Sequence, residues 1–417
     1  MYLAVKQQLN HLSKNEYKIL RELCHIAKNL KNQAIYNVRQ YYFENKQYLN
    51  YNKNYNLLKT SENYKILNSN MAQQILKEVD KNFKSFFSLL KLAQKGEYDY
   101  KACKLPHYLP KDGFTTLIIG MVRIKGNKLI LPYSNLYRKN HAPIEITLPP
   151  TLDGKTIKDI RIIPKSDARF FEIQYIYEAE CISRNLNKNN ALALDPGVSN
   201  LVTAVTTSGK SFIVDGRKIK SINQWYNKEN ARLQSVKDKQ HYKGKTTKRQ
   251  IMLAHKRNNR VNDYLSKAAK MIIDYCIDND IGTLVFGYNK TFQKSPGFTK
   301  TTNQNFVNIP FGKLQLKLKY LCKLNDIKYV EQEESYTSQS SFWDKDDIPV
   351  YRVNTNQKYT FSGERTHRGM YKRNNGKRLN ADVNGALNIL KKSNVVSLDA
   401  LYSRGEVDTP VRIRVAW

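Results

Sequence analysis

The spacing of apolar and polar residues divides the chain into parts with different expected secondary structure. In residues 13–95 apolar side chains recur at helical spacing, and Lys, Asn and Tyr fill the positions between them. Residues 105–182 instead alternate with the period of a strand, and Gly126 followed by Asn127 is a two-residue hairpin signal. A strand-like segment at 2–10 is expected to join these strands, so that the helices form an insertion in a β barrel.

From residue 190 onward the pattern is that of an α/β domain. A strand at 191–195 is followed by a hairpin, and helical and strand patterns then alternate. The expected elements are strands at 201–205, 211–214, 283–286 and 327–332, and helices at 217–279, 311–324 and from about residue 380. Because a three-strand meander followed by helix–strand units is the ribonuclease H-like order, we predict an α/β multidomain protein that contains such a domain.

The composition adds a strong positive charge to this picture. The 417 residues include 70 Lys and Arg against 36 Asp and Glu, a net charge of +34. An enzyme with a small neutral substrate has no need of such a field, which indicates nucleic acid first and an anionic membrane surface second. Residues 237–260 carry one acid, Asp238, among many basic residues; a solvated face is the common explanation, but here we favour a phosphate track.

The cysteines and the longest apolar runs favour a cytoplasmic protein. No two cysteines form a CxxC pair, which argues against a disulfide framework or a zinc knuckle and fits buried thiols in a reducing compartment. No apolar run approaches about 20 residues, the length that crosses a membrane. The residues concerned are Cys24, Cys103, Cys181, Cys276 and Cys322.

Two carboxylates far apart in the sequence are the candidates for chemistry. Asp195 ends an apolar strand, and Asp382 lies at the start of a helix. Alone, each is weak evidence: an Asp before Pro-Gly is more often an ordinary strand-to-turn residue, and Asp382 is also explained as part of a helix cap. Together, on this α/β order, they indicate a phosphodiester-cutting site, because carboxylates hold the Mg²⁺ ions that activate water and stabilise the leaving oxygen.

The segments around these acids resemble a known family. Ala193-Leu194-Asp195-Pro196-Gly197 and residues 381–389 are similar to the first and third RuvC motifs of TnpB, a transposon-encoded RNA-guided DNA endonuclease related to type V CRISPR effectors. The resemblance implies two Mg²⁺ ions, with Asp195 and Asp382 as the first and last catalytic acids. It also implies a β-barrel wedge domain (1–12 and 100–188), a helical recognition insertion (13–99), a RuvC domain (189–394) and a C-terminal tail (395–417).

The sequence departs from the family in two places. The second motif usually ends its strand with Glu, but Gly287 stands at that place here. The family's zinc module has two CxxC pairs, whereas residues 336–379 contain no Cys and have Ser338, Ser340 and Ser341 around the first expected pair. We therefore expect no zinc, and a short basic loop in place of the knuckle.

A glutamate on the neighbouring strand is the candidate replacement for the missing acid. The strand that starts at 327 continues into Glu333 and Glu334 and should end at the same edge of the sheet as Gly287, which would leave room for a longer side chain. Period-two alternation places Val330 and Glu334 on one face and Glu333 on the other, so we favour Glu334 narrowly over Glu333 as catalytic acid and metal ligand. An exposed acidic strand end in a protein that no longer cleaves is the alternative.

The expected function is RNA-guided cleavage of DNA beside a short target-adjacent motif, by a bacterial, cytoplasmic and preferably monomeric protein. The partners would be a structured guide RNA and double-stranded target DNA, without a membrane. A nuclease-inactive, guided DNA-binding repressor is the alternative, and a ribonuclease H-like strand-transferase is a more distant one. The residues expected to contact nucleic acid are Lys243, Lys245, Lys248, Arg249, Lys256, Arg257, Arg260, Arg365, Arg368, Lys372 and Arg373.

Overall fold

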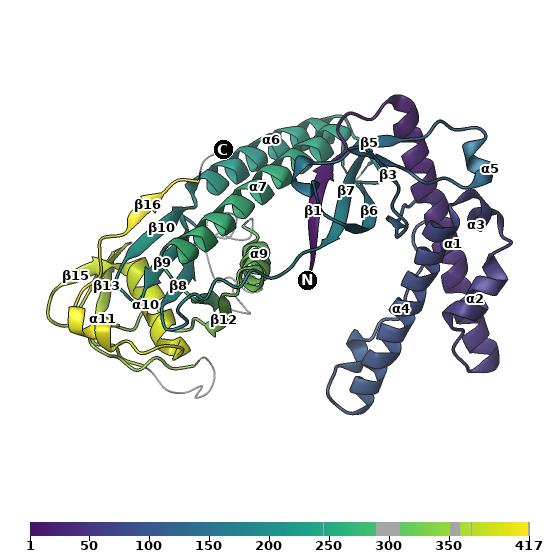
Figure 1. Cartoon of the computed structure of the whole chain (residues 1–417). Helices are drawn as coiled ribbons and strands as arrows, with labels where there is room; N and C mark the ends of the chain where they lie inside the picture. The colour runs from purple at the N-terminus through teal and green to yellow at the C-terminus, as the bar shows by residue number, and fades with distance from the viewer. Residues whose placement is uncertain (245, 289–308, 351–358, 368, 416–417) are drawn as a thin grey trace. The chain divides into compact units, whose positions relative to one another are not determined.

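Two units make up the chain in the computed structural model, Met1–Ala179 and Glu180–Trp417 (Figure 1). The structure describes residues 1–244, 246–288, 309–350, 359–367 and 369–415. Of the residues expected to contact nucleic acid, Lys245 and Arg368 lie outside the described residues.

The helical segment of the first unit consists of four helices. They are α1 (Lys14–Asn45), α2 (Tyr51–Leu58), α3 (Glu62–Ile66) and α4 (Ser69–Gln94). The breaks occur where a polar side chain accepts a hydrogen bond from the first turn of the next helix, as Asn50, Ser61 and Asn68 do. The helical pattern of residues 13–95 is thus confirmed.

Two antiparallel sheets form the β part of this unit. One has the order β1-β7-β6-β2, with β1 (Tyr2–Gln8), β2 (Leu117–Ile119), β6 (Ile157–Lys165) and β7 (Phe170–Glu178). The other contains β3 (Ile124–Lys125), β4 (Lys128–Ile130) and β5 (Glu145–Thr147), while α5 (Asn135–Arg138) and the short helices η1 (Tyr100–Ala102) and η2 (Pro150–Leu152) lie in connections. The first strand was expected to join these sheets, and it does so by pairing with β7; the two-residue loop between β3 and β4 was also expected.

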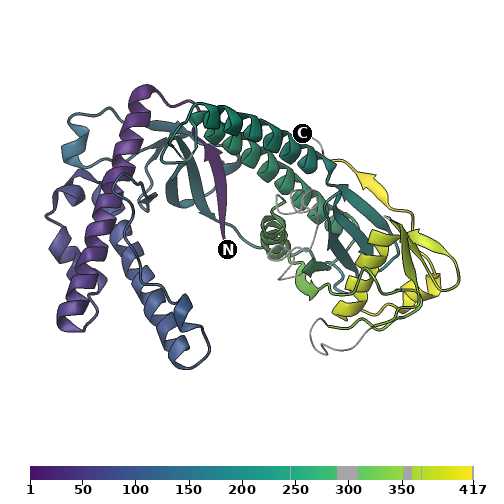
Figure 2. The same cartoon turned by 180° about the vertical axis from the view of Figure 1, so that it is seen from behind.

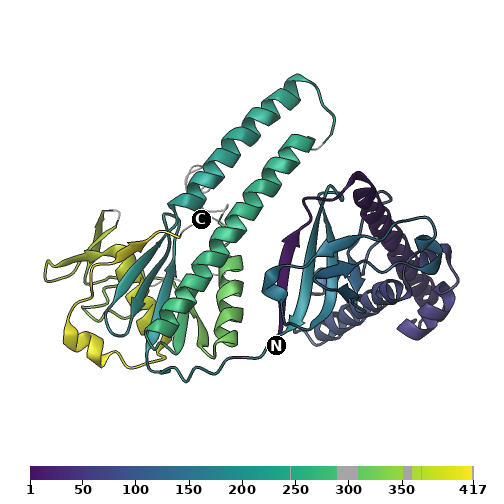
Figure 3. The same cartoon turned by 45° about the horizontal axis from the view of Figure 1, so that its top comes forward.

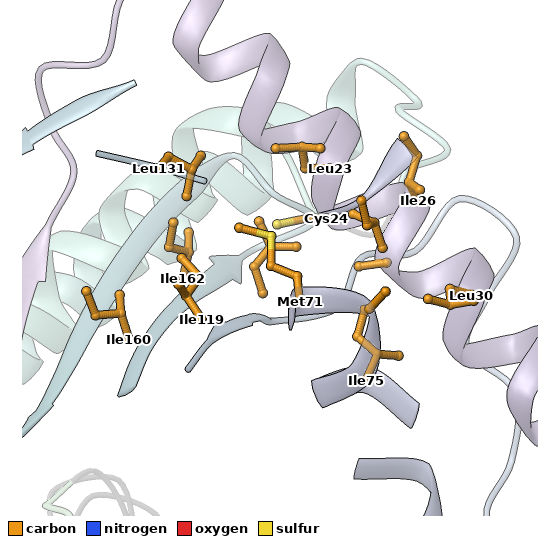
Figure 4. Close-up of a cluster of buried hydrophobic side chains, with 14 of the residues drawn as sticks. Leu23, Cys24, Ile26, Leu30, Met71, Ile75, Ile119, Leu131, Ile160 and Ile162 are labelled. Carbon is orange, nitrogen blue, oxygen red and sulfur yellow. The ribbon is translucent and has the colours of Figure 1, made fainter. Parts of the chain in front are cut away.

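One hydrophobic core joins the helices to both sheets. Figure 4 shows side chains of α1 and α4 gathered against side chains from the strands, among them Leu23, Cys24, Met71, Ile75, Ile119, Ile160 and Ile162. Burial of this many apolar groups stabilises the unit by far more than the local helix and strand preferences do.

The second unit is built on a six-stranded mixed sheet with the order β12-β11-β8-β9-β10-β16. Its first five strands in chain order are β8 (Ala191–Pro196), β9 (Asn200–Thr206), β10 (Ser211–Asp215), β11 (Thr283–Tyr288) and β12 (Lys328–Glu333). β8, β9 and β10 form an antiparallel meander, while β11 and β12 continue the sheet parallel to β8. This is the predicted ribonuclease H-like order.

The long helical stretch expected over 217–279 is present, and it consists of two helices. α6 (Arg217–Lys239) and α7 (Lys248–Asp278) pack antiparallel, and their connection lies at the end remote from the sheet (Figure 3). Thr247 begins α7 with a capping box: its side chain accepts from the backbone of Gln250, whose side chain accepts from the backbone of Thr247. That reciprocal cap favours a new helix start over a continuous helix.

Helices cover both faces of the six-stranded sheet (Figure 2). α7 and α9 (Phe311–Leu324) belong to the same core as Leu192 and Leu194 of β8, whereas α10 (Ala381–Ser393) packs on Ala191 and Ala193. Alternate residues of a strand point to opposite faces, and the alanines let α10 approach β8 closely.

The last part of the chain adds structure that the sequence pattern did not indicate. β13 (Glu364–His367), β14 (Met370–Lys372) and β15 (Arg378–Asn380) form an antiparallel sheet where a basic loop was expected. After α11 (Asp399–Arg404), β16 (Val411–Ile413) pairs parallel with β10 as the edge strand. Among the described residues, no helix has the length and apolar character needed to span a membrane.

The expectation that the cysteines are buried holds for three of the five. Cys24, Cys276 and Cys322 are buried, Cys181 is exposed and Cys103 is intermediate. Cys103 and Cys181 lie in connecting segments outside the cores, which explains the difference.

Candidate active site

Asp195 lies at the carboxyl end of the central strand β8, under helix α10. Its Oδ2 is 2.6 Å from where a Cβ on Gly385 would lie, so any side chain at residue 385 would displace the carboxylate. The motif around Asp382 therefore contributes more than its acid: Gly385 lets the backbone of α10 approach Asp195.

Asp382 lies in the first turn of α10, two residues after the helix cap. The Asn380 side chain accepts hydrogen bonds from the backbone N–H groups of Asp382 and Val383. The Asp382 carboxylate accepts from Asn200 Nδ2 at 2.7 Å on Oδ2 and from Arg365 Nη2 at 3.1 Å on Oδ1. Both carboxylate oxygens are thus oriented by donors from other elements.

Glu334 fills the space that Gly287 leaves open. Its Oε2 is 3.1 Å from where a Cβ on Gly287 would lie, and Cδ1 of Ile389 on α10 is 2.6 Å from that point. Gly287 pairs with Gln332 on β12, and the preceding Phe286 pairs with Leu194 beside Asp195. A glutamate two residues beyond Gln332 therefore reaches across β11 toward the end of β8.

Glu333 is engaged elsewhere. Its Oε2 accepts a hydrogen bond from Lys392 Nζ at 2.6 Å, and its Oε1 accepts from the backbone N–H of Ser335 at 2.7 Å. Although burial opposes it, these bonds lower the pKa of Glu333, which therefore carries its charge in a stable ion pair. The two adjacent glutamates thus have different environments.

The segment that follows Glu334 is held by two buried asparagines of α10. Asn384 Nδ2 donates to the carbonyl of Ser340 at 2.7 Å, and its Oδ1 accepts from the backbone of Phe342 at 3.2 Å. Asn388 Nδ2 donates to the carbonyls of Thr337 and Ser340 at 2.8 and 2.6 Å. One helix thereby carries Asp382 and anchors the chain just after Glu334.

Asp195 and Glu334 are carboxylates in surroundings that disfavour their ionised forms. Burial and the neighbouring Glu334 and Asp382 raise the pKa of Asp195 well above its usual range, and Arg365 only partly offsets this. Burial and the Glu333 charge raise the pKa of Glu334 to about 7. Because such shifts mean that the ionised forms are unfavourable, a cation at this place would be stabilised.

The donor chemistry of these residues fits Mg²⁺, which prefers carboxylate oxygens. The arrangement is not a finished site, since within the described residues no three His, Cys, Asp or Glu side chains are grouped closely enough to hold a metal. The Arg365 guanidinium also lies 3.1 Å from Asp382 Oδ1 and forms an ion pair with it. The side chains that would hold the ions are Asp195, Glu334 and Asp382.

The basic residues expected to contact nucleic acid fall into separate groups. Lys243, Lys248, Arg249, Lys256 and Arg260 are exposed around the free end of the α6–α7 hairpin. Arg257 instead turns inward, where its Nε donates to Asn223 at 2.8 Å and its guanidinium lies over Tyr226. Arg365 contacts Asp382, while Lys372 and Arg373 are half-buried in or beside β14.

The segment in place of the zinc module is stabilised by packing and hydrogen bonds. Phe342 is buried and stacks on Tyr402 of α11, and Tyr371 donates to the carbonyl of Gln339 at 2.7 Å. Ser341, near the place of an expected Cys, donates to Asp344 at 2.5 Å. These contacts explain the three-stranded sheet found where a loop was expected.

Sequence reasoning missed Gly385, Asn200 and the anchoring role of Asn384 and Asn388. The repeated Asn at 384 and 388 was a usable signal, because polar residues four apart share a helix face and require partners when that face is buried. Asn200 carried no such signal, since its contact to Asp382 spans 182 residues.

Comparisons with known proteins agree with this description. Residues 174–293 match the OrfB_IS605 family model, described as a probable transposase, and residues 311–389 match the Cas12f1-like TNB domain. No curated protein matches the sequence.

Solved structures of similar fold include the Cas12f1 chain of a Cas12f1–sgRNA–target DNA complex, with 15% identity and a TM-score of 0.55 over 90% of this chain and 83% of that one. The mini-RNA-guided endonuclease CRISPR-Cas_phi3 has 10% identity and a TM-score of 0.48, over 95% of this chain and 92% of that one. The two family models cover both segments that carry Asp195 and Asp382, and the resemblance inferred from the sequence is confirmed: these segments are similar to OrfB_IS605 (TnpB) transposases and to the Cas12f1-like TNB domain, and the fold resembles that of a Cas12f1 chain.

Proposed function

We propose that this protein is an RNA-guided DNA endonuclease of a transposable element, in which the second catalytic acid of the RuvC site is Glu334. The observation that carries the proposal is the Glu334 carboxylate beside Gly287, in the space that a side chain at the usual acid position would occupy. Double-stranded DNA as target and a structured RNA as guide are supported by the net charge of +34 and by the likeness to a Cas12f1–sgRNA–target DNA complex.

In this proposal Asp195, Glu334 and Asp382 hold two Mg²⁺ ions. The bound ions would activate a water and stabilise the leaving oxygen of the phosphodiester. Before that, Asp195 and Glu334 release protons that their raised pKa values retain near neutral pH. Arg365 has to leave Asp382 Oδ1, and its exposed position allows the guanidinium to pair with a phosphate of the DNA instead.

The exposed basic end of the α6–α7 hairpin is proposed to bind RNA or the guide–target heteroduplex by contacting the negatively charged phosphate backbone of the nucleic acid. Side chains such as Lys248, Arg249 and Lys256 are free to follow phosphates, because they extend from helices without taking part in the core. Cutting beside a target-adjacent motif also belongs to the proposal, and rests on the resemblance alone.

The test is cleavage of matched duplex DNA by the chain with its guide RNA and Mg²⁺. We expect Asp195→Ala and Glu334→Gln to abolish cleavage while guided DNA binding persists. Glu333→Gln is the matched control and should still cut, because Glu333 is paired with Lys392. Cleavage that survives Glu334→Gln but not Glu333→Gln would refute the assignment of the relocated acid.

A guided DNA-binding repressor is the second candidate. It is favoured by Gly287 at the usual acid position and by the ion pair between Arg365 and Asp382. Guided binding by the wild-type chain without any nicking, at ample Mg²⁺, would establish this function in place of cleavage.

A further inference from the structure

A short series of hydrogen bonds connects the C-terminal strand to the acid on α10. Arg412 of β16 donates from Nη2 to Asn200 Oδ1 at 2.8 Å. Asn200, the first residue of β9, in turn donates from Nδ2 to Asp382 Oδ2 at 2.7 Å. Three elements from distant parts of the sequence thereby meet at one carboxylate.

The direction of these bonds matters because an asparagine amide has one accepting end and one donating end. If the Asn200 amide turned over, its oxygen would face the Asp382 carboxylate, and the hydrogen bond would become a repulsion. A guanidinium can only donate, so Arg412 requires the oxygen of Asn200 to face it and leaves the NH₂ group for Asp382. Arg412 thus selects the amide orientation that supports Asp382.

The backbone around Asn200 is fixed independently. Two glycines let the backbone close around this residue. A Cβ on Gly197, in the turn between β8 and β9, would lie 2.8 Å from the Asn200 carbonyl oxygen, and a Cβ on Gly216, which follows β10, would lie 2.7 Å from the carbonyl oxygen of Val198 in that turn. Only the side-chain amide of Asn200 is therefore left to be oriented.

Arg412 is fixed by the sheet edge. It pairs with Ile213 of β10 in the parallel ladder, and its Nη1 lies 3.4 Å from Asp215, a buried carboxylate that also binds Arg217. The side chain is about one third exposed. The guanidinium therefore spans the two strands β9 and β10 at the end nearest the acids.

We propose that Arg412 is a positioning residue for the metal site, acting through Asn200 to orient the Asp382 carboxylate. The inference rests on the proposed metal-holding role of Asp382. A carboxylate oxygen that accepts one hydrogen bond keeps a lone pair for a cation, and such outer partners typically change metal affinity by about 10- to 100-fold when removed. The C-terminal strand, which contributes no acid, thus takes part in metal binding.

The experiment is a double-mutant cycle read out as metal affinity of the full-length chain. Mn²⁺ replaces Mg²⁺, because its free concentration can be followed by electron paramagnetic resonance without guide RNA or DNA. Arg412→Ala and Asn200→Ala are each expected to weaken Mn²⁺ binding, on the order of 10-fold. In the Asn200→Ala background, Arg412→Ala should have no further effect, because Arg412 acts through the amide that is already absent.

Arg414→Ala is the matched control, since Arg414 is an exposed arginine two residues along the same segment and should leave Mn²⁺ affinity unchanged. An unchanged affinity in Arg412→Ala would overturn the proposal. Equal losses in both backgrounds would also overturn it, since they would mean that the substitution merely detaches β16. Mn²⁺ binding at the proposed site should also be lost in Asp195→Ala. If the wild-type chain shows no such Asp195-dependent binding, that result counts against the proposal as well.

Guided cleavage by the wild-type chain is measured in parallel and separates the two proposals. Its absence, with the predicted pattern of Mn²⁺ affinities intact, would refute the nuclease function and leave the role of Arg412 standing. Cleavage by the wild-type chain, combined with a Mn²⁺ affinity that Arg412→Ala does not change, would support the nuclease function and refute the role of Arg412.

Discussion

Replacing Glu334 with glutamine should stabilise the metal-free protein while removing its cleavage activity. The substitution keeps the shape of the side chain in the space beside Gly287 and removes a buried charge. In the wild-type chain burial and the Glu333 charge raise the pKa of Glu334 from 4.5 to about 7, so the folded state disfavours the ionised form.

The magnitude and its pH window follow from that shift. Between about pH 4.5 and 7 the folded chain binds more protons at Glu334 than the unfolded chain, so this group lowers the unfolding free energy as the pH rises. A shift of this size corresponds to about 3 kcal/mol at pH 8, since one pKa unit is about 1.4 kcal/mol. Below pH 4.5 the glutamate is protonated in both states, and the substitution should have no such effect.

The assay is thermal unfolding at pH 5 and pH 8, with a chelator present. For a unit of this size, about 3 kcal/mol corresponds to a rise in Tm of roughly 6–12 °C at pH 8. Glu333→Gln is the control with the opposite sign, because it breaks the ion pair with the buried Lys392 and should lower the Tm. A Glu334→Gln variant that is no more stable than wild type at pH 8 would refute the reasoning.

Three further outcomes follow from the same geometry. Gly385→Ala should abolish cleavage because its Cβ would displace the Asp195 carboxylate, whereas Gly312→Ala, which meets no atom within 4 Å, should leave cleavage unchanged; loss of activity in both would contradict this. Mn²⁺ affinity should increase as the pH rises through about 7, with proton release detectable by calorimetry in buffers of different ionisation enthalpy, since the buried carboxylates must ionise first. Lys256→Ala should weaken RNA binding and reduce the salt dependence of that binding, with the Tm unchanged. Arg257→Ala should instead lower the Tm, because it removes the contact with Asn223 between α6 and α7; the opposite pattern would contradict our assignment of these two residues.

Much of the second unit was predictable from sequence, because strand spacing and strand order are local signals. The apolar run before Asp195 gave β8, and the alternation along β12 placed Glu334 and Glu333 on different faces, in agreement with their different surroundings. The role of Glu334 as a metal ligand stays a prediction.

Other features were out of reach because they depend on contacts between distant segments. The break between α6 and α7 depends on the capping box at Thr247, which a long helical pattern obscures. In the three-stranded sheet over 364–380, Leu379 packs against a small core around Phe342 that is assembled from distant segments. The contact of Arg412 with Asn200 requires β16 to pair with β10. A strand of three residues is too short for its sequence periodicity to predict this pairing.

The space beside Gly287 has a consequence for how such a site can change over time. An acid at residue 287 would compete with Glu334 and with Ile389 for one volume, because the Glu334 oxygen lies 3.1 Å, and Cδ1 of Ile389 2.6 Å, from the place that a Cβ at 287 would take. Neither Gly287→Glu nor Glu334→Ala alone gives a well-packed site with three acids. The two positions should therefore covary among proteins of this fold: glycine at 287 with glutamate at 334, or an acid at 287 with a smaller side chain at 334. An engineer who moves the acid back to β11 has to change both residues together.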